Sequence, residues 1–249
     1  MKKIILVLAV AAVIVGGIYA HAGKNKALAI TQKPPEHVEK KTPPSAEPAG
    51  VKTIENFQKY QDGKFPKWWK TWPMQRGDAQ QVYRVRVEGG KHYLEAKDDK
   101  DLSEQIMNVF VWNTDEYPYL NWRWRPRTLP TGAKESDDNL NDSACGIYVV
   151  FGRYSGVASK YVWSTTLPKG TIVSRRGGDL RILSMGSGQG GLNKWHSYSV
   201  NVLDSANKLF GKTMERKPTG IGILTDANAT HTAAACDYAD FSISKKPLY

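Results

Sequence analysis

The sequence predicts an all-β protein, a β-sandwich or jelly roll with one short helix. Short runs of β-branched and aromatic residues alternate with polar ones, and clusters of Gly, Pro, Asn and Asp separate these runs. Strands joined by turns in this way are typical of sandwiches and jelly rolls. The helix is expected at Leu203–Phe210, with Gly211 as its stop. No internal repeat occurs.

The expected strands follow one another through the second two thirds of the chain. Tyr83–Val87 alternates cleanly, and Gly89-Gly90 turns it toward His92–Ala96 as a hairpin. Leu120–Arg125 also alternates, and Pro126 is expected to end it. The other expected strands are Gln105–Trp112, Cys145–Phe151, Lys160–Ser164, Leu180–Met185, Trp195–Val202, Gly220–Leu224 and Asp237–Ser244.

The N-terminal segment has the features of a secretory signal peptide. Lys2 and Lys3 form a positive start, residues 4–20 are apolar, and Ala20-His21-Ala22 matches an A-x-A cleavage pattern. The alternative is an uncleaved anchor, because the apolar run is only slightly shorter than the roughly 20 residues that span a bilayer. Residues 1–22 are therefore expected to export the protein to the periplasm or cell envelope, with or without anchoring it to the inner membrane.

Residues 23–52 are rich in Lys, Pro and Ala and hold almost no large apolar side chain, so they are expected to form a disordered linker. The β-sandwich domain is then expected at residues 53–249. The formal net charge is +11. For an exported chain, the expected partner is a saccharide or an anionic envelope polymer rather than nucleic acid. Membrane contact is expected only through the N-terminal segment, if it stays uncleaved.

The chain has two cysteines, Cys145 and Cys236. In an exported protein they can form one disulfide, provided that their strands lie close together. The alternative is a pair of buried free thiols. Neither cysteine lies near the cleavage pattern, which excludes a lipid-anchored lipoprotein.

Five stretches carry a resemblance to a known family: Asp62–Pro66, Tyr119–Trp124, Ile147–Phe151, Tyr161–Trp163 and Gly220–Thr230. From about Phe57 to its end, the chain resembles the bacterial family known as domain of unknown function 3047. Such proteins are similar in strand order to jelly-roll carbohydrate-binding modules, so the resemblance implies a jelly roll. The family's late segment typically reads Asp-x-Asp-Asn-Thr. Here Asn228 replaces the second acid and Ala229 follows it, which weakens a metal site at this place.

Arg123 and Arg125 are the leading candidates for ligand binding. Alternation in Leu120–Arg125 places both on one side of a strand, with Cα atoms about 7 Å apart. Guanidinium groups donate bidentate hydrogen bonds to hydroxyls or to a carboxylate. Trp112 and Trp163 are candidates for stacking against sugar rings, and the alternative for such tryptophans is packing in the core.

A third group of candidates follows the strand that ends at Leu224. Thr225–Thr230 places oxygen atoms at alternate residues, as a calcium loop does, but no bidentate acid closes the loop. An Asx-type turn is the simpler interpretation, so no metal is expected. Asp226, Asn228 and His231 stay candidates for binding a polar ligand.

The sequence contains no complete catalytic motif. Gly186–Gly191 fits G-x-G-x-x-G formally, but a strand is expected after it where a dinucleotide site needs a helix. No G-x-S-x-G, H-E-x-x-H or paired-Cys metal spacing occurs, and no cofactor is expected. The leading functional expectation is a non-catalytic envelope domain that binds a saccharide or acidic glycan. The alternatives are a polysaccharide hydrolase or lyase on the same fold and a structural subunit of an envelope complex.

Overall fold

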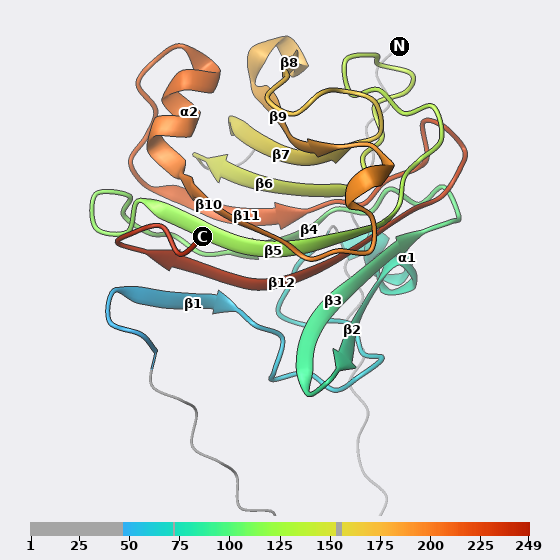
Figure 1. Cartoon of the computed structure of the whole chain (residues 1–249), viewed down its shortest axis with the longest axis horizontal. Helices are drawn as coiled ribbons and strands as arrows, with labels where there is room; N and C mark the ends of the chain where they lie inside the picture. The colour runs from blue at the N-terminus through green and yellow to red at the C-terminus, as the bar shows by residue number, and fades with distance from the viewer. Residues whose placement is uncertain (1–46, 72, 153–155) are drawn as a thin grey trace, which may run out of the picture. The chain divides into compact units, whose positions relative to one another are not determined.

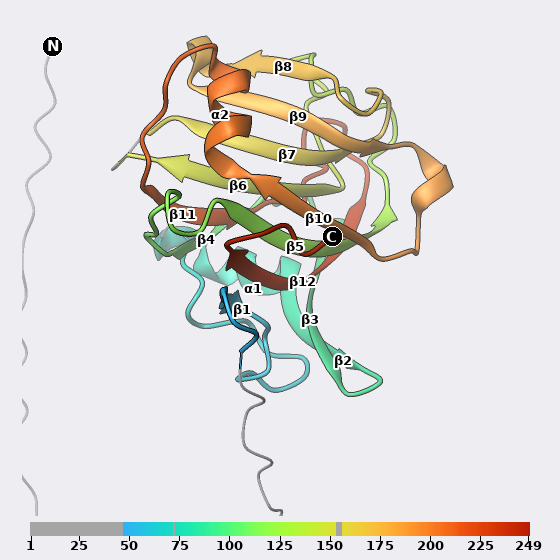
Figure 2. The same cartoon turned by 60° about the vertical axis from the view of Figure 1, so that its left-hand side comes forward.

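The computed structural model describes residues 47–71, 73–152 and 156–249. Within these ranges, two six-stranded sheets stack on each other (Figures 1 and 2), which confirms the predicted β-sandwich. Sheet A contains β1 (Val51–Glu55), β2 (Tyr83–Glu88), β3 (Lys91–Asp98), β5 (Tyr119–Thr128), β10 (His196–Asn201) and β12 (Ala234–Ser244). Sheet B contains β4 (Ile106–Val109), β6 (Cys145–Phe151), β7 (Ala158–Ser164), β8 (Ile172–Arg175), β9 (Leu180–Ser187) and β11 (Pro218–Ile223).

Both sheets mix hairpins of consecutive strands with pairs of strands that are distant in sequence. Sheet A runs β10-β5-β12-β3-β2, with β1 also paired to β12, and sheet B runs β4-β11-β6-β7-β9-β8. The pair β7–β9 is parallel, whereas β12 is antiparallel to β1, β3 and β5. The late strand β12 therefore lies inside sheet A, where it aligns β3 and β5.

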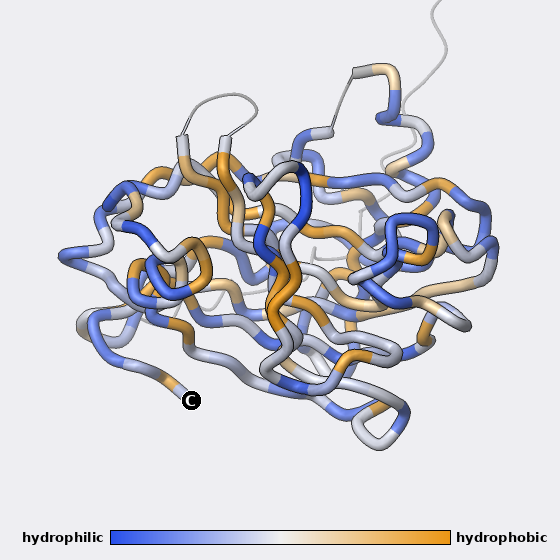
Figure 3. The backbone as a smooth tube through the Cα atoms, turned by 90° about the horizontal axis from the view of Figure 1, so that it is seen from above, coloured by the Kyte–Doolittle hydropathy of each residue, from blue (hydrophilic) through white to orange (hydrophobic). Residues whose placement is uncertain are grey.

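The core lies between the sheets, and alternation along the strands fills it. On β5, Leu120, Trp122 and Trp124 are fully buried. Figure 3 shows hydrophobic stretches through the middle of the molecule and hydrophilic stretches in the peripheral loops. Cys145 on β6 and Cys236 on β12 form a disulfide with Cα atoms 5.4 Å apart. Of the two states considered for the cysteines, the disulfide is the one found, and it joins sheet A to sheet B.

Two helices flank the sheets. The predicted helix is confirmed as α2 (Val202–Phe210), with Asn201 accepting a hydrogen bond from the backbone N–H of Asp204 and Gly211 ending the helix at φ 64°. The helix α1 (Arg76–Val82) was not predicted. Its sequence has too few apolar residues to show the periodicity that predicts a helix, and its buried residues are Ala79 and Val82. Short 3₁₀ turns occur at Pro73–Gln75, Arg176–Gly178 and Gln189–Gly191.

The expectation that Pro126 ends its strand is wrong, because β5 continues to Thr128. The pairing of β5 with β12 shifts register between Ala235 and Cys236, opposite Pro126. A bulge at this point removes the need for a hydrogen bond from the proline nitrogen. The strands β1 and β8 were also not predicted, and both are only four or five residues long.

The expected signal peptide at residues 1–22 and most of the expected linker at residues 23–52 lie outside the described residues. β1 begins at Val51, within the last two residues assigned to that linker. In the described ranges, no helix has the length and apolar character needed to cross a membrane.

Candidate functional site

The outer face of sheet A, which points away from sheet B, gathers arginines and carboxylates from several strands. Alternation on β5 places Arg123 and Arg125 on this face, while the tryptophans between and beside them enter the core. Figure 1 shows the β2–β3 hairpin bending away from β12 on this side of the molecule. Side chains of β2, β3 and β12 therefore lie beside the two arginines.

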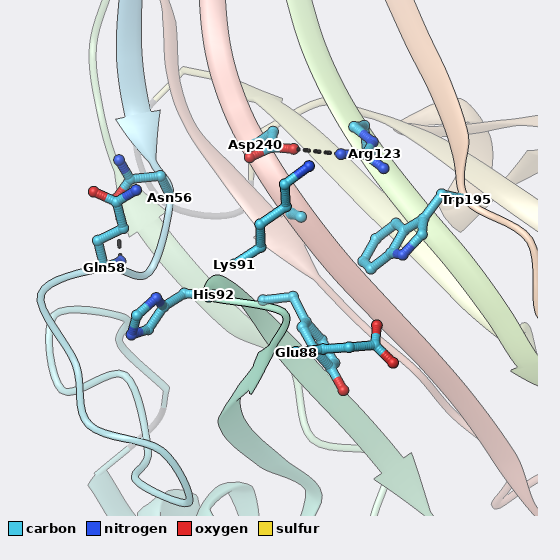
Figure 4. Close-up of a pocket in the computed structure, with 11 residues that line it drawn as sticks. Asn56, Gln58, Glu88, Lys91, His92, Arg123, Trp195 and Asp240 are labelled. Atoms are coloured by element: carbon cyan, nitrogen blue, oxygen red, sulfur yellow. Dashed lines mark hydrogen bonds and ion pairs between the residues drawn. The ribbon is translucent and has the colours of Figure 1, made fainter. Parts of the chain in front are cut away.

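Asp240 reaches this face because β12 is bulged. Between the pairs at Ala239 and Ser242, β12 holds one residue more than β5. Asp240 occupies the bulge with φ 57°, a left-handed conformation that Asp adopts more readily than most residues. Its carboxylate lies 3.0 Å from the guanidinium of Arg123 (Figure 4).

Arg125 is the most enclosed cation of this face, with 7 % of the residue exposed. Its Nε lies 2.7 Å from Asp237 and its Nη1 lies 3.0 Å from Glu88. Burial opposes the charge of Arg125, but the hydrogen bonds and attraction of these two carboxylates outweigh it and raise the pKa of Arg125. Burial also raises the pKa of Asp237, although Arg125 and Arg127 work against that rise.

Two aromatic rings enclose the arginines. The guanidinium carbons of Arg123 and Arg125 lie 5.0 Å and 4.8 Å from the centre of a Trp195 ring. Tyr93 meets Trp195 edge to face at 5.8 Å and lies 5.2 Å from the guanidinium carbon of Arg125. These distances suit cation–π contacts, so the rings and the cations hold one another in place.

A pocket of about 340 Å³ lies over these groups. A second hollow of about 220 Å³ shares Tyr93 with the first and continues along the face past Asp237 and Arg127. We call the two together the sheet A groove. Figure 4 shows Trp195 on one wall of the pocket and the side chains of Lys91 and Asp240 beside Arg123. The pocket is lined by Asn56, Gln58, Glu88, Gly90, Lys91, His92, Tyr93, Arg123, Trp195, Ala239 and Asp240.

Two carboxylates of the second hollow lie opposite each other. Glu95 on β3 and Asp237 on β12 are register partners, and both line this hollow. Glu95 also lies 3.3 Å from Arg84 and 3.7 Å from Arg86. Each carboxylate therefore has arginine partners. The groove therefore offers hydrogen-bond donors, acceptors and aromatic faces.

Of the candidates from the sequence, Arg123 lines this groove, and Arg125 is buried beside it against Glu88 and Asp237. Trp112 and Trp163 are each 5 % exposed and lie in the core. Asp226 and Asn228 line a separate hollow beside sheet B. The side chain of His231 is mostly exposed, and its Nδ1 lies 3.0 Å from Asp101.

Several groove residues were missed by the sequence reasoning. Tyr93 belongs to the predicted hairpin strand, and alternation along that strand places it on the outer side with Glu95. Trp195 begins a predicted strand next to β5. No local pattern pointed to Asp240, because a bulge position is not visible in one sequence. In the part of the chain that the structure describes, no group of three or more His, Cys, Asp or Glu side chains is arranged to hold a metal ion.

Fold and site together define a disulfide-linked β-sandwich with a charged and aromatic groove on one outer face. The disulfide suggests an extracytoplasmic protein. The chain belongs to the family described as protein of unknown function DUF3047, whose model matches residues 67–242. This membership confirms the resemblance seen in the sequence. No curated protein matches the chain.

Three solved structures with a similar fold are described as a xyloglucanase domain, a Cel12A catalytic domain and a cellulase. The xyloglucanase domain of NopAA, a type three effector from Sinorhizobium fredii in complex with cellobiose, has 8 % identity and a TM-score of 0.41, over 80 % of this chain and 100 % of that chain. The catalytic domain of Humicola grisea Cel12A in complex with a thio cellotetraose has 9 % identity and a TM-score of 0.38, over 64 % and 83 %. A cellulase derived from Cel12A of Rhodothermus marinus has 10 % identity and a TM-score of 0.36, over 65 % and 85 %.

Proposed function

We propose that this protein is a non-catalytic binding domain of the cell envelope and that its sheet A groove binds a saccharide. One observation carries the proposal: the rings of Trp195 and Tyr93 line the same groove as the ion pair of Arg123 with Asp240 and the carboxylates that hold Arg125. Sugar rings present C–H surfaces that pack on aromatic rings and hydroxyls that need both donors and acceptors. This groove supplies the aromatic rings, the hydrogen-bond donors and the hydrogen-bond acceptors.

The charges of the groove favour a neutral or weakly acidic saccharide. Arg123 and Arg125 each have a carboxylate partner within 3.0 Å, so neither is free to neutralise a strongly anionic chain. An ion pair of this kind still offers unused N–H groups and carboxylate oxygen lone pairs to hydroxyls. Lys91 has no carboxylate within 4.0 Å among the described residues, and it is the cation available to one acidic substituent.

Binding is tested with the full-length protein on a glycan array that holds neutral and uronate-containing oligosaccharides. Trp195→Ala should weaken binding about tenfold or more, because an aromatic residue at the centre of a site dominates its affinity. Trp68→Ala is the matched control, since Trp68 is 58 % exposed and does not line the groove. Equal binding by both variants, or no binding to any glycan, would refute a saccharide site in the groove.

The second candidate function is hydrolysis of a glycan, and the opposed pair Glu95 and Asp237 favours it. Glycosidases use two facing carboxyl groups, one of which must hold a proton to donate. Burial raises the pKa of Asp237 despite the opposing effect of Arg125 and Arg127, so Asp237 is the carboxyl group of the pair that suits a proton donor. A reducing-end assay on glycans that bind separates the two functions. If the wild type releases reducing ends and the variants Glu95→Gln and Asp237→Asn do not, the protein is a hydrolase and the binding proposal is wrong.

We also propose that residues 1–22 export the protein. The leader-like sequence supports this proposal, and so does the disulfide, which forms in oxidising compartments. Fusion of residues 1–60 to a reporter that is active only outside the inner membrane should give signal. The N-terminal residue of the recovered protein then separates cleavage after Ala22 from retention as an anchor.

A further inference from the structure

A separate hollow, the one that Asp226 and Asn228 line, lies on the outer face of sheet B, on the other side of the sandwich from the sheet A groove. Its volume is about 400 Å³. Three residues in register across β6, β7 and β9 line it, namely Tyr148, Lys160 and Ile182. The apolar Leu180 and Leu224 also line the hollow. The site is thus built on strands, with polar loops around its mouth.

Lys160 is buried in this hollow, with 3 % of the residue exposed. Its Nζ donates to Oγ of Ser143 at 3.3 Å and lies 5.4 Å from the centre of the Tyr148 ring. Throughout residues 47–71, 73–152 and 156–249, no carboxylate oxygen lies within 4.0 Å of this ammonium. Burial opposes the charge of Lys160, but the attraction of Asp226, Tyr148 and Glu135 outweighs it and raises the pKa of Lys160, so the side chain stays an ammonium. Because Nζ donates only to Ser143 among the described residues, its other N–H groups are available to an anionic group of a ligand.

Asp226 lines the same hollow and is also 3 % exposed. Its Oδ1 accepts a hydrogen bond from the backbone N–H of Ser143 at 2.9 Å. Ser143 therefore contacts both the carboxylate of Asp226 and the ammonium of Lys160. Within the described ranges, Oδ2 of Asp226 receives no hydrogen bond from the protein, so this oxygen is available to a hydroxyl group.

The remaining carboxylates near Lys160 already have donors on the protein. Glu135 accepts hydrogen bonds from the hydroxyls of Ser143 at 3.1 Å and Ser164 at 2.6 Å. Asp142 accepts three hydrogen bonds from residues 229 and 230, which fold the loop after β11 around it. Neither carboxylate needs Lys160 as a hydrogen-bond donor. The three donor hydrogens of the ammonium are therefore not consumed by these acids.

Two arginines lie at the mouth of the hollow. Arg175 is engaged with Asp138, 2.5 Å away. Arg176 is exposed and adopts φ 52°, followed by Gly177 at 63° and Gly178 at 105°. A left-handed arginine is a strained conformation, and such strain concentrates at binding sites. This turn places a second cation, Arg176, in the lining of the hollow.

We infer that this hollow is a second binding site, for a carboxylate whose neighbouring carbon atoms carry hydroxyl groups, which is the chemistry of a sugar acid. Lys160 and Arg176 bind the carboxylate, and Oδ2 of Asp226 accepts a hydrogen bond from a hydroxyl. The side chains of Leu180 and Ile182 pack against the C–H surface of the ring. The volume falls within the range of about 300–1,000 Å³ that small-molecule sites occupy. The inference does not rest on the sheet A groove.

The test is calorimetric titration of the full-length protein with four probes. Galacturonate carries the carboxylate and the hydroxyls, galactose carries only the hydroxyls, acetate carries only the carboxylate, and trigalacturonate carries the same group at a chain end. Galacturonate should bind at least about tenfold more tightly than galactose or acetate, because loss of a charged hydrogen bond has about that effect. Binding of trigalacturonate as well assigns the site to a polymer end, whereas exclusion of trigalacturonate assigns it to free sugar acids.

Two variants locate the binding. Lys160→Met keeps most of the length of the side chain but removes its charge, and it should abolish galacturonate binding. Arg176→Ala changes an exposed residue and should weaken binding about tenfold without affecting the fold. It keeps the test valid if Lys160→Met fails to fold. Lys208→Ala is the control, because it removes an exposed cation of α2 that lines neither the sheet A groove nor this hollow, and it should leave the affinity for galacturonate unchanged. No galacturonate binding, equal affinity for galactose or acetate, or full affinity in Arg176→Ala would overturn the inference.

Discussion

Arg125 and Asp237 are register partners on β5 and β12, and their side chains form an ion pair of 2.7 Å with both groups more than nine-tenths buried. Removal of Arg125 leaves the buried carboxylate of Asp237 with only the 3.7 Å contact to Arg127. We therefore expect Arg125→Ala to lower the free energy of unfolding by about 3 kcal/mol, measured by urea unfolding.

Arg123→Ala is the matched control for this ion pair. The side chain of Arg123 is 27 % exposed, and its partner Asp240 is 45 % exposed. Exposed pairs contribute only about 0–1 kcal/mol, so this variant should unfold at nearly the same urea concentration as the wild type. Equal decreases in the free energy of unfolding in the two variants would show that burial of the Arg125 ion pair does not increase its contribution to stability.

Trp163 packs against two glycines, Gly186 and Gly191. A Cβ atom at Gly191 would lie 2.2 Å from the indole, and one at Gly186 would lie 2.4 Å from it. Gly191→Ala should therefore cost about 1–3 kcal/mol of stability, because the indole must move within a packed region. Gly190→Ala is the control, since a Cβ at Gly190 meets nothing within 4 Å. Similar melting temperatures for both variants would contradict this packing.

The disulfide Cys145–Cys236 closes a loop with a sequence separation of 91 residues. Reduction should lower the free energy of unfolding by about 2–5 kcal/mol, since the cross-link restricts the unfolded chain. The measurement is urea unfolding with and without dithiothreitol, with thiol titration to confirm reduction. A double variant, Cys145→Ala with Cys236→Ala, should match the reduced protein and should not respond to dithiothreitol.

Asp226 should make stability depend on pH. Burial raises its pKa from the ordinary 3.8 to about 6, and Asp142 and Glu135 also raise it, although Lys160 lowers it. The folded state thus holds the proton more tightly than the unfolded state, so the contribution of Asp226 is fully present below pH 3.8 and is lost as pH rises through 6. The loss amounts to up to about 3 kcal/mol.

The variant Asp226→Asn cannot ionise and should remove this part of the pH dependence. Its stability should fall less than that of the wild type between pH 4 and pH 7, as measured by thermal unfolding across that range. The same slope in both proteins would mean that the carboxyl group of Asp226 titrates normally.

The sequence was sufficient for the fold class, because alternation is a local property. In Leu120–Arg125 it separates the core tryptophans from the two arginines without reference to the rest of the chain. The cysteine pairing was not predictable, since it depends on the contact between β6 and β12. The continuation of β5 past Pro126 was missed because the register shift that tolerates the proline, with Arg127 as the extra residue of β5, depends on the pairing with β12.

The candidate site was less predictable, since its residues come from distant segments. Arg123 and Arg125 were visible as a pair, but their partners Asp237 and Asp240 depend on the register between β5 and β12. Lys160 is in a predicted strand, yet its burial depends on Ser143 and on the loop after β11. Single-sequence patterns give the orientation of a side chain on its strand and carry no information about what faces it.

The position of β12 also constrains the order of events during biosynthesis. This strand follows every other strand of the described chain, yet it pairs with β1, β3 and β5 inside sheet A and supplies one cysteine of the cross-link. A ribosome must therefore translate β12 before sheet A can close. Until then β3 and β5 lack the strand that lies between them, and Cys145 lacks its partner, so the cross-link marks completion of the sandwich rather than an early step of folding.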